Sequence, residues 1–147
     1  FLDLFAGSGG IGIEALSRGA KRVTLVEKSG AAAGIITKNI SKIRLDDPSE
    51  LRFCKSGVSQ ALERFGQAGE KFDIVFMDPP YKDAPMRLEE ETKLIREYGL
   101  LAEGGMIILE HDRDFEPPEE LNGFKRVRSC SYGITVITFF RDFIVGG

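Results

Sequence analysis

The 147-residue chain contains only two cysteines, one histidine and no tryptophan, and no apolar run approaches the roughly 20 residues of a membrane-spanning helix. Cys54 and Cys130 lie far apart, so we expect reduced thiols in a cytoplasmic protein and not a disulfide scaffold. One histidine and two distant cysteines match no common zinc-ligand spacing, and we expect no bound metal. These shortages argue against disulfide-rich, zinc-binding and membrane-spanning proteins.

The chain also lacks a large excess of either charge, because it has 20 basic and 23 acidic residues and a formal net charge of −3. This balance argues against a domain that holds nucleic acid by bulk electrostatics alone, although an enzyme with a local basic face stays compatible with it. Apolar residues make up 42% and charged residues 29% of the chain, as in ordinary folded proteins. We therefore expect one domain over residues 1–147 with a single core.

Short β-rich runs alternate with longer amphipathic stretches along most of the chain, which is typical of α/β proteins. Strands are predicted near residues 1–5, 22–27, 51–55, 72–77 and 106–110. Helices are predicted near residues 11–18, 31–43, 59–65 and 87–98. The last two β-rich runs, 124–131 and 134–141, are separated by Tyr132-Gly133 alone and predict an antiparallel hairpin. The expected fold is a mostly parallel sheet that ends in this hairpin and carries helices on both faces.

A glycine-rich segment joins the first predicted strand to the first helix, and its Gly7, Gly9 and Gly12 satisfy G-x-G-x-x-G. Glycines permit a sharp turn and a close approach of backbone to ligand, and the helix start offers free N–H groups. Glu27 ends the second strand twenty residues after Gly7 (27 − 7), where a carboxylate accepts hydrogen bonds from ribose hydroxyls. The pair indicates a cofactor that contains a nucleoside.

Asp3, at the end of the first strand, bears on which cofactor this is. A carboxylate repels the pyrophosphate of a dinucleotide but attracts the sulfonium and ammonium of S-adenosyl-L-methionine, so Asp3 favours the methyl donor over NAD. The alternative interpretation makes Asp3 a turn or capping acid and Glu27 an ordinary strand-exit residue. An NAD-binding Rossmann protein with the same glycine loop also stays open.

The segment Asp78-Pro79-Pro80-Tyr81-Lys82 directly follows the buried-looking strand 72–77. Two prolines prevent the sheet ladder from continuing and leave a stiff extended turn with free carbonyls. An exocyclic amine is a poor nucleophile, and acceptors at Asp78 and Pro79 would hold its two N–H bonds and stabilise the positive charge that grows on nitrogen. Tyr81 would stack on the planar substrate group. Alternatively, the loop only ends a strand.

The motifs FLDLFAGSGGIGIEALSRGA, VTLVEKS and FDIVFMDPPY together resemble the RsmD family of 16S ribosomal RNA guanine-N2 methyltransferases, within the Rossmann-like S-adenosylmethionine-dependent methyltransferases. The resemblance implies a three-layer α/β/α fold with a seven-stranded sheet whose last strand is antiparallel. It also implies methyl transfer from S-adenosyl-L-methionine to the N2 amine of a guanine, guanine 966 in the usual rRNA numbering. The partner would be 16S rRNA within a small-subunit assembly particle.

The resemblance also implies roles for individual residues. Those expected at the donor are Asp3, Phe5, Gly7 and Gly9 at its methionine end, Glu27 at its ribose, and Gly57 and Val58 at its adenine. Those expected at the acceptor are Asp78, Pro79 and Tyr81 as catalytic groups, with Pro80 and Lys82 as further substrate contacts. Ser56 is a departure, because many relatives carry an acidic residue there. A second departure is the absence of the N-terminal segment that precedes the first strand in the family.

Other interpretations stay open. Similar loops serve DNA adenine-N6 and glutamine-N5 methyltransferases, although glutamine enzymes usually have Asn where Asp78 stands. A trimmed domain could act only as a binding module on ribosomal precursors. His111 could be a general base, but a positioned amine can lose its proton to water. Basic residues that could touch phosphates, or could equally belong to a solvated strand edge, are Lys125, Arg126 and Arg128 with Lys82 and Arg87.

Overall fold

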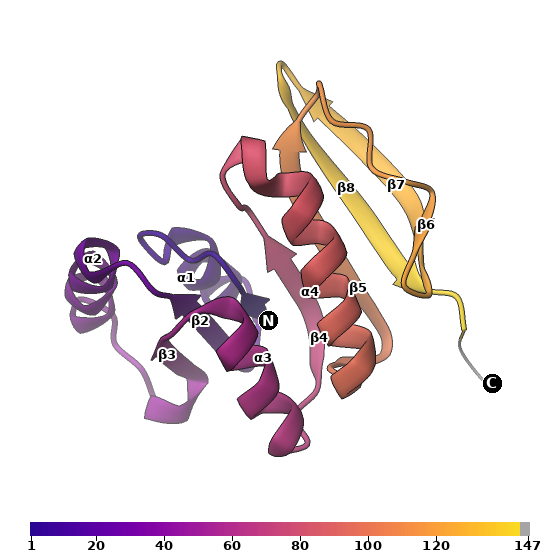
Figure 1. Cartoon of the computed structure of the whole chain (residues 1–147). Coiled ribbons are helices and arrows are strands. Elements are labelled where there is room, and N and C mark those ends of the chain that lie inside the picture. Colours follow the sequence, from indigo (N-terminus) through magenta and orange to yellow (C-terminus); the bar gives the residue numbers. More distant parts are fainter. Residues whose placement is uncertain (145–147) are drawn as a thin grey trace.

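A computed structural model describes residues 1–144 and arranges them around one eight-stranded sheet with the strand order β3-β2-β1-β4-β5-β8-β7-β6 (Figure 1). The strands are β1 (Leu2–Asp3), β2 (Val23–Glu27), β3 (Leu51–Lys55), β4 (Phe72–Met77), β5 (Leu101–Asp112), β6 (Glu120–Leu121), β7 (Phe124–Tyr132) and β8 (Thr135–Asp142). The α-helices are α1 (Gly10–Ser17), α2 (Gly30–Ser41), α3 (Val58–Gln67) and α4 (Ala84–Tyr98), and the short 3₁₀ helices are η1 (Pro48–Glu50) and η2 (Tyr81–Asp83).

Strands β1 to β5 pair in parallel, whereas β8 runs antiparallel to both β5 and β7. This confirms the predicted mostly parallel α/β sheet and its terminal hairpin. The strand count differs from the expected seven because the two-residue strand β6 pairs with the start of β7. A two-residue strand has no alternation that a sequence pattern could reveal.

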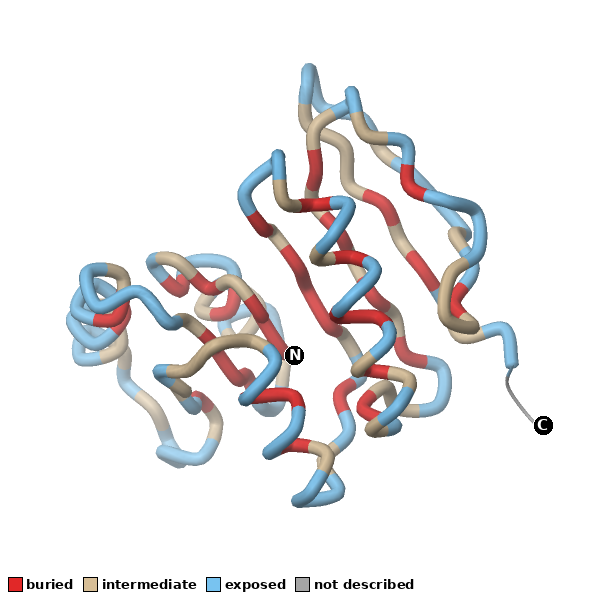
Figure 2. The backbone as a smooth tube through the Cα atoms, viewed as in Figure 1, coloured by how far each residue is buried: buried red, intermediate tan, exposed pale blue. Residues whose placement is uncertain are grey.

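Helices lie on both faces of the sheet, as predicted. In Figure 1, α3 and α4 lie in front of the sheet and α1 lies behind it. Two apolar clusters correspond to these layers: the larger one includes Leu62 of α3 and Leu88 of α4, and the smaller one joins Leu25 of β2 to Ile36 of α2. Figure 2 shows buried segments along the central strands and exposed ones on the outer sides of the helices.

The strand order reverses between β1 and β4, and this reversal positions the site. From β1 the chain passes to β2 and β3 on one side, and it returns to β4 on the other. Backbone bonds extend both pairings past the strand end, from Leu4 N to the Phe76 carbonyl and from Ala6 N to the Val26 carbonyl, each at 3.0 Å. The loops that leave neighbouring strands here diverge to opposite faces and leave a crevice, which is where open α/β sheets bind ligands.

Within residues 1–144, none of the helices combines the length and the apolar character needed to cross a bilayer. Cys54 and Cys130 are free thiols. They lie on β3 and β7, which are separated by several strands in the sheet order, so they do not form a disulfide with each other.

Candidate functional site

The glycine loop makes the turn from β1 into α1 with two residues in the left-handed region, Gly7 at φ 58° and Gly9 at φ 83°. Gly9 caps α1 without a side-chain hydrogen bond of its own, and the first N–H group of the helix, that of Gly10, donates to Ser8 Oγ at 3.4 Å. Gly12 serves packing, because a Cβ there would overlap the Leu25 side chain of β2. The three glycines of the motif therefore provide a turn, a helix cap and a close contact between helix and strand.

Glu27 connects the glycine loop to the start of α2. Its Oε1 accepts a hydrogen bond from Gly7 N at 2.8 Å, and its Oε2 accepts one from Ser29 N at 3.0 Å. Ser29 in turn caps α2 by accepting from Ala32 N. A carboxylate oxygen can accept more than one hydrogen bond, so ribose hydroxyls could still bind here. Glu27 thus has a structural role that the sequence pattern did not indicate, in addition to the predicted ligand role.

Asp78 follows β4 and lies beside Glu110 of β5, the neighbouring strand. The register pairs Met77 with Leu109, so the next residues of both strands lie side by side. The Glu110 carboxyl lies close enough to Asp78 to raise its pKa, both as a hydrogen-bond partner of the protonated acid and by its charge. Burial, this hydrogen bond and the charges of Glu110 and Asp3 raise the pKa of Asp78 to about 7. Sequence reasoning missed Glu110, whose position at a strand end was its one signal.

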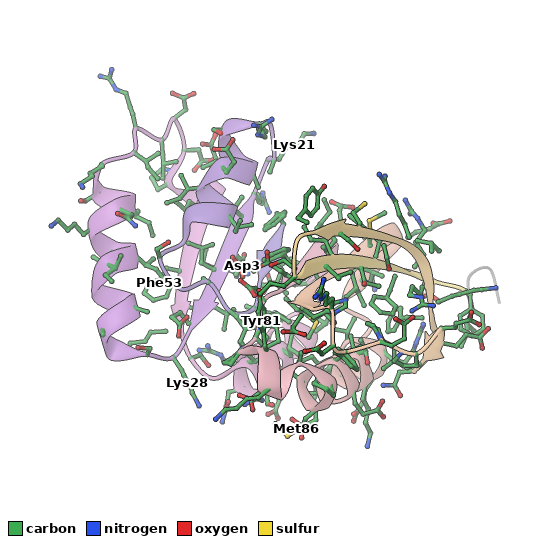
Figure 3. All side chains as sticks on the ribbon, turned by 90° about the horizontal axis from the view of Figure 1, so that it is seen from above. Asp3, Lys21, Lys28, Phe53, Tyr81 and Met86 are labelled. Atoms are coloured by element: carbon green, nitrogen blue, oxygen red, sulfur yellow. The ribbon has the colours of Figure 1, made fainter. Side chains whose placement is uncertain are left out.

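Asp3 is not among the residues that line the pocket. Its side chain is almost fully buried, and its Oδ1 accepts a hydrogen bond from Phe5 N at 3.2 Å. Burial, reinforced by the charge of Glu27, raises the pKa of Asp3 to about 7, against the lowering effect of the Phe5 hydrogen bond. Figure 3 views the molecule from above and labels Asp3 and Tyr81, which come from β1 and η2. Asp3 would therefore act on a bound cation by its charge and not by direct contact.

A pocket of about 680 Å³ opens where these loops meet, which is within the range for small-molecule sites. Predicted residues in its wall are Phe5, Gly7, Glu27, Gly57, Val58, Asp78, Pro79, Pro80 and Tyr81. Predicted residues outside its wall are Asp3, Gly9 and Lys82. The structure therefore brings together both motifs, the glycine loop and the Asp-Pro-Pro-Tyr segment, on one cavity. The individual contacts of these residues to donor or acceptor stay predictions.

The wall also contains Ser56, named from the sequence as a departure from the family, and Arg87, named as a residue that could touch phosphates. Wall residues that sequence analysis did not name are Leu4, Lys28, Ser59, Gln60 and Asp83. Arg87 lies 3.4 Å from Glu91, one turn further along α4. Glu91 is fully buried, and its Oε2 has no hydrogen-bond partner among the described residues. Burial raises the pKa of Glu91 to about 7, although Arg87 opposes the shift. Glu91 thereby holds the Arg87 guanidinium at the pocket.

His111 does not reach the pocket. Its Nδ1 lies 2.8 Å from the Asp112 carbonyl and its Nε2 lies 2.7 Å from Thr138 Oγ1, so both ring nitrogens have partners in the core of the hairpin. This placement argues against a role for His111 as a general base. The basic hairpin residues are also partly engaged, because Arg126 pairs with Glu116 and Arg128 lies over the Phe139 ring.

The chain matches a family model described as "Conserved hypothetical protein 95" over residues 1–141. It is 36% identical over 140 residues to a Bacillus subtilis protein named "Putative rRNA methyltransferase YlbH", covering 95% of this chain and 74% of that one. It is 35% identical over 111 residues to the Escherichia coli "Ribosomal RNA small subunit methyltransferase D", covering 76% of this chain and 52% of that one. The chain thus spans about half to three quarters of these relatives.

A solved structure of a conserved hypothetical protein from Streptococcus pyogenes superimposes with a TM-score of 0.83 at 33% identity, covering 95% of this chain and 82% of that one. The sequence match, the sheet order and the two motifs on one pocket all agree with the predicted resemblance. The chain belongs to the conserved hypothetical protein 95 family, which is the RsmD family of Rossmann-like methyltransferases.

Proposed function

We propose that this chain transfers a methyl group from S-adenosyl-L-methionine to the exocyclic N2 amine of a guanine in 16S rRNA. The observation that carries the proposal is that the Asp-Pro-Pro-Tyr segment and the glycine loop line the same pocket. The first offers acceptors suited to an amine, and the second offers a nucleoside-binding site. The two relatives described above carry rRNA methyltransferase names, and this supports RNA as the substrate class.

The residues of the pocket fit this donor better than a dinucleotide. Glu27 and Asp78 line the pocket with carboxyl groups, and the buried Asp3 lies close enough to Asp78 to influence its pKa. Such groups attract a sulfonium and an ammonium and repel a pyrophosphate. Glu27 would accept from the ribose, while Gly57 and Val58 would contact the adenine between β3 and α3. When bound, the donor supplies an electrophilic methyl group.

The acceptor amine would lie against Asp78 and Pro79. Each oxygen takes one N–H hydrogen bond, so the nitrogen lone pair is directed at the methyl group. As the N–C bond forms, the C–S bond of the donor would break and its sulfur would leave as the neutral thioether of S-adenosylhomocysteine. Positive charge would develop on the amine nitrogen, and both oxygens would stabilise it. Tyr81, on η2, presents its ring to the base. The methylated amine then releases one proton to water, which restores its neutral form.

The proposal is tested by incubating the protein with tritiated S-adenosyl-L-methionine and small ribosomal subunits that lack this modification. We expect label in N2-methylguanosine after the RNA is digested to nucleosides. Label in N6-methyladenosine, in DNA or only in protein would contradict the assignment and favour another amine acceptor.

The rate of methyl transfer should depend on pH. We expect kcat/KM for the donor to fall as the pH drops below about 7, because the pKa values of Asp3 and Asp78 are both raised to about 7. Below that pH both carboxyls gain protons, and the pocket then loses the charge that attracts the donor, while Asp78 becomes a hydrogen-bond donor. Asp78→Asn removes one of the two groups and should make the acid side of the profile less steep.

This pH dependence is measured from initial rates between about pH 5.5 and 8.5 at low donor concentration, where kcat/KM reports groups of the free enzyme. The charge of Asp3 raises the pKa of Asp78, so the observed pKa values belong to this pair and not to either residue alone. A profile that stays flat across this range would contradict the expected titration.

A further inference from the structure

The turn between β7 and β8 carries two large side chains that are not buried in the core. Tyr132 is 65% exposed and Ile134 is 59% exposed, although turn tips are usually small and polar. Gly133 has φ 64° at the first turn position, as in the tight turns that join antiparallel strands. Exposed aromatic and aliphatic side chains on a tight turn are candidates for contact with a partner.

This turn lies beside the Asp-Pro-Pro-Tyr segment. The Tyr81 hydroxyl lies 3.2 Å from Thr135 Oγ1, which joins η2 to the first residue of β8. The Arg113 backbone N–H donates to the Ile134 carbonyl at 2.9 Å, which ties the turn to the end of β5. The turn is therefore anchored at the rim of the proposed active site, and its position is fixed by two separate hydrogen bonds.

The side chains of Tyr132 and Glu110 project from the same face of the sheet. Tyr132 is the cross-strand partner of Thr135, which is the partner of Asp112 on β5. Side chains of directly paired residues project from the same face, and so do those two residues apart along a strand. Glu110 precedes Asp112 by two residues, so Tyr132 and Glu110, the hydrogen-bond partner of Asp78, project from one face.

Two basic side chains without an ion-pair partner among the described residues lie near this turn. Arg113 follows β5 next to the turn, and Lys82 follows Tyr81. Both residues are exposed, and neither makes an ion pair with any residue in the part of the chain described. Aromatic rings next to unengaged cations are the features that bind single-stranded nucleic acid, through stacking on bases and contact with phosphates.

We propose that the β7–β8 turn is an RNA-contact surface on which Tyr132 stacks against a nucleotide adjacent to the methylated one, while Arg113 and Lys82 contact its phosphates. The inference rests on the proposed function and extends it, because it names a second contact for the RNA outside the pocket. Ile134 would cover the sugar or the edge of the stacked base. The RNA would then be held on both sides of Tyr81.

Kinetics on small subunits that lack the modification test the contribution of the ring. For Tyr132→Ala we expect KM for the particle to rise about tenfold with kcat little changed, since a loss of this size lies within the range that base stacking on an aromatic ring contributes. Tyr132→Phe retains the ring and should behave like the parent. Val127→Ala, which truncates a 50% exposed side chain on β7 of the same hairpin, is the matched control. Donor affinity, measured with S-adenosylhomocysteine by calorimetry, should be equal in all four proteins.

A crosslinking experiment identifies the partner. A photoreactive benzophenone side chain in place of Tyr132 should crosslink to 16S rRNA in the particle, and the same group at Val127 should not. A crosslink to a ribosomal protein, or none at all, would overturn the inference, as would a Tyr132→Ala variant with the KM of the Val127→Ala control. These outcomes are distinct from failure of the proposed function, in which the parent itself would place no methyl group on guanine.

Discussion

Asp78→Ala is expected to lower the rate of methyl transfer at least a hundredfold while S-adenosylhomocysteine still binds with nearly the parent affinity. The side chain that is lost accepts a hydrogen bond from the reacting amine, and its contribution grows as positive charge develops on nitrogen. Removal of one such preorganised group typically costs 10²- to 10³-fold in turnover, or about 2.7–4 kcal/mol. Asp78→Asn keeps one acceptor oxygen and should lose less activity.

The measurements are single-turnover methyl transfer and calorimetric titration with S-adenosylhomocysteine. The matched control is Asp73→Ala, which removes an exposed carboxylate at the other end of the same strand, β4. This control should retain the parent rate. If Asp78→Ala transfers methyl groups as fast as Asp73→Ala does, Asp78 has no part in the reaction.

Glu27→Ala is expected to weaken donor affinity by tenfold or more. The side chain holds Gly7 N and Ser29 N at 2.8 Å and 3.0 Å, so its removal loosens the glycine loop and the start of α2. It also removes the proposed acceptors for the ribose hydroxyls. Hydrogen bonds to a charged group contribute about 1.5–3 kcal/mol each, so the loss of even one corresponds to at least about tenfold.

Calorimetric titration with S-adenosylhomocysteine measures this loss, and thermal unfolding of the unliganded protein separates the ligand contacts from the structural ones. Glu27→Gln retains one acceptor oxygen and should lie between the parent and the alanine variant. Glu14→Ala serves as the control, because Glu14 makes only an exposed ion pair with Arg18 on α1. Equal affinities for Glu27→Ala and Glu14→Ala would rule out a role for Glu27 at the donor.

Much of the fold could be predicted from local sequence patterns. Strands β3 and β4 have the predicted bounds, and β2 begins one residue later than predicted, because their buried β-rich runs are bounded by clear breaks. Strand β5 begins at Leu101, five residues before the predicted start, because Gly104 and Gly105 obscure its first part. The Phe1–Phe5 strand is reduced to Leu2–Asp3, where both neighbouring strands pair with it.

The site could be predicted only where its residues belong to a contiguous motif. Glu110 and Arg87 belong to none, since Glu110 reaches Asp78 through the pairing of β4 with β5, and Arg87 reaches the pocket because the first turns of α3 and α4 both line it. Both depend on the order of elements in space. The second role of Glu27, as an acceptor for two backbone N–H groups, likewise depends on how the glycine loop folds back over β2.

The position of β8 has a consequence for how the protein is synthesised. This strand lies between β5 and β7, so β5 lacks a neighbour on that side until residues 135–142 have been made. A nascent chain that ends earlier exposes the edge of β5, and exposed strand edges promote association with other chains. Thr135, the residue next to Tyr81, also arrives in this last segment. Translation therefore produces the glycine loop and the Asp-Pro-Pro-Tyr segment first, and the strand that places Thr135 against Tyr81 follows later.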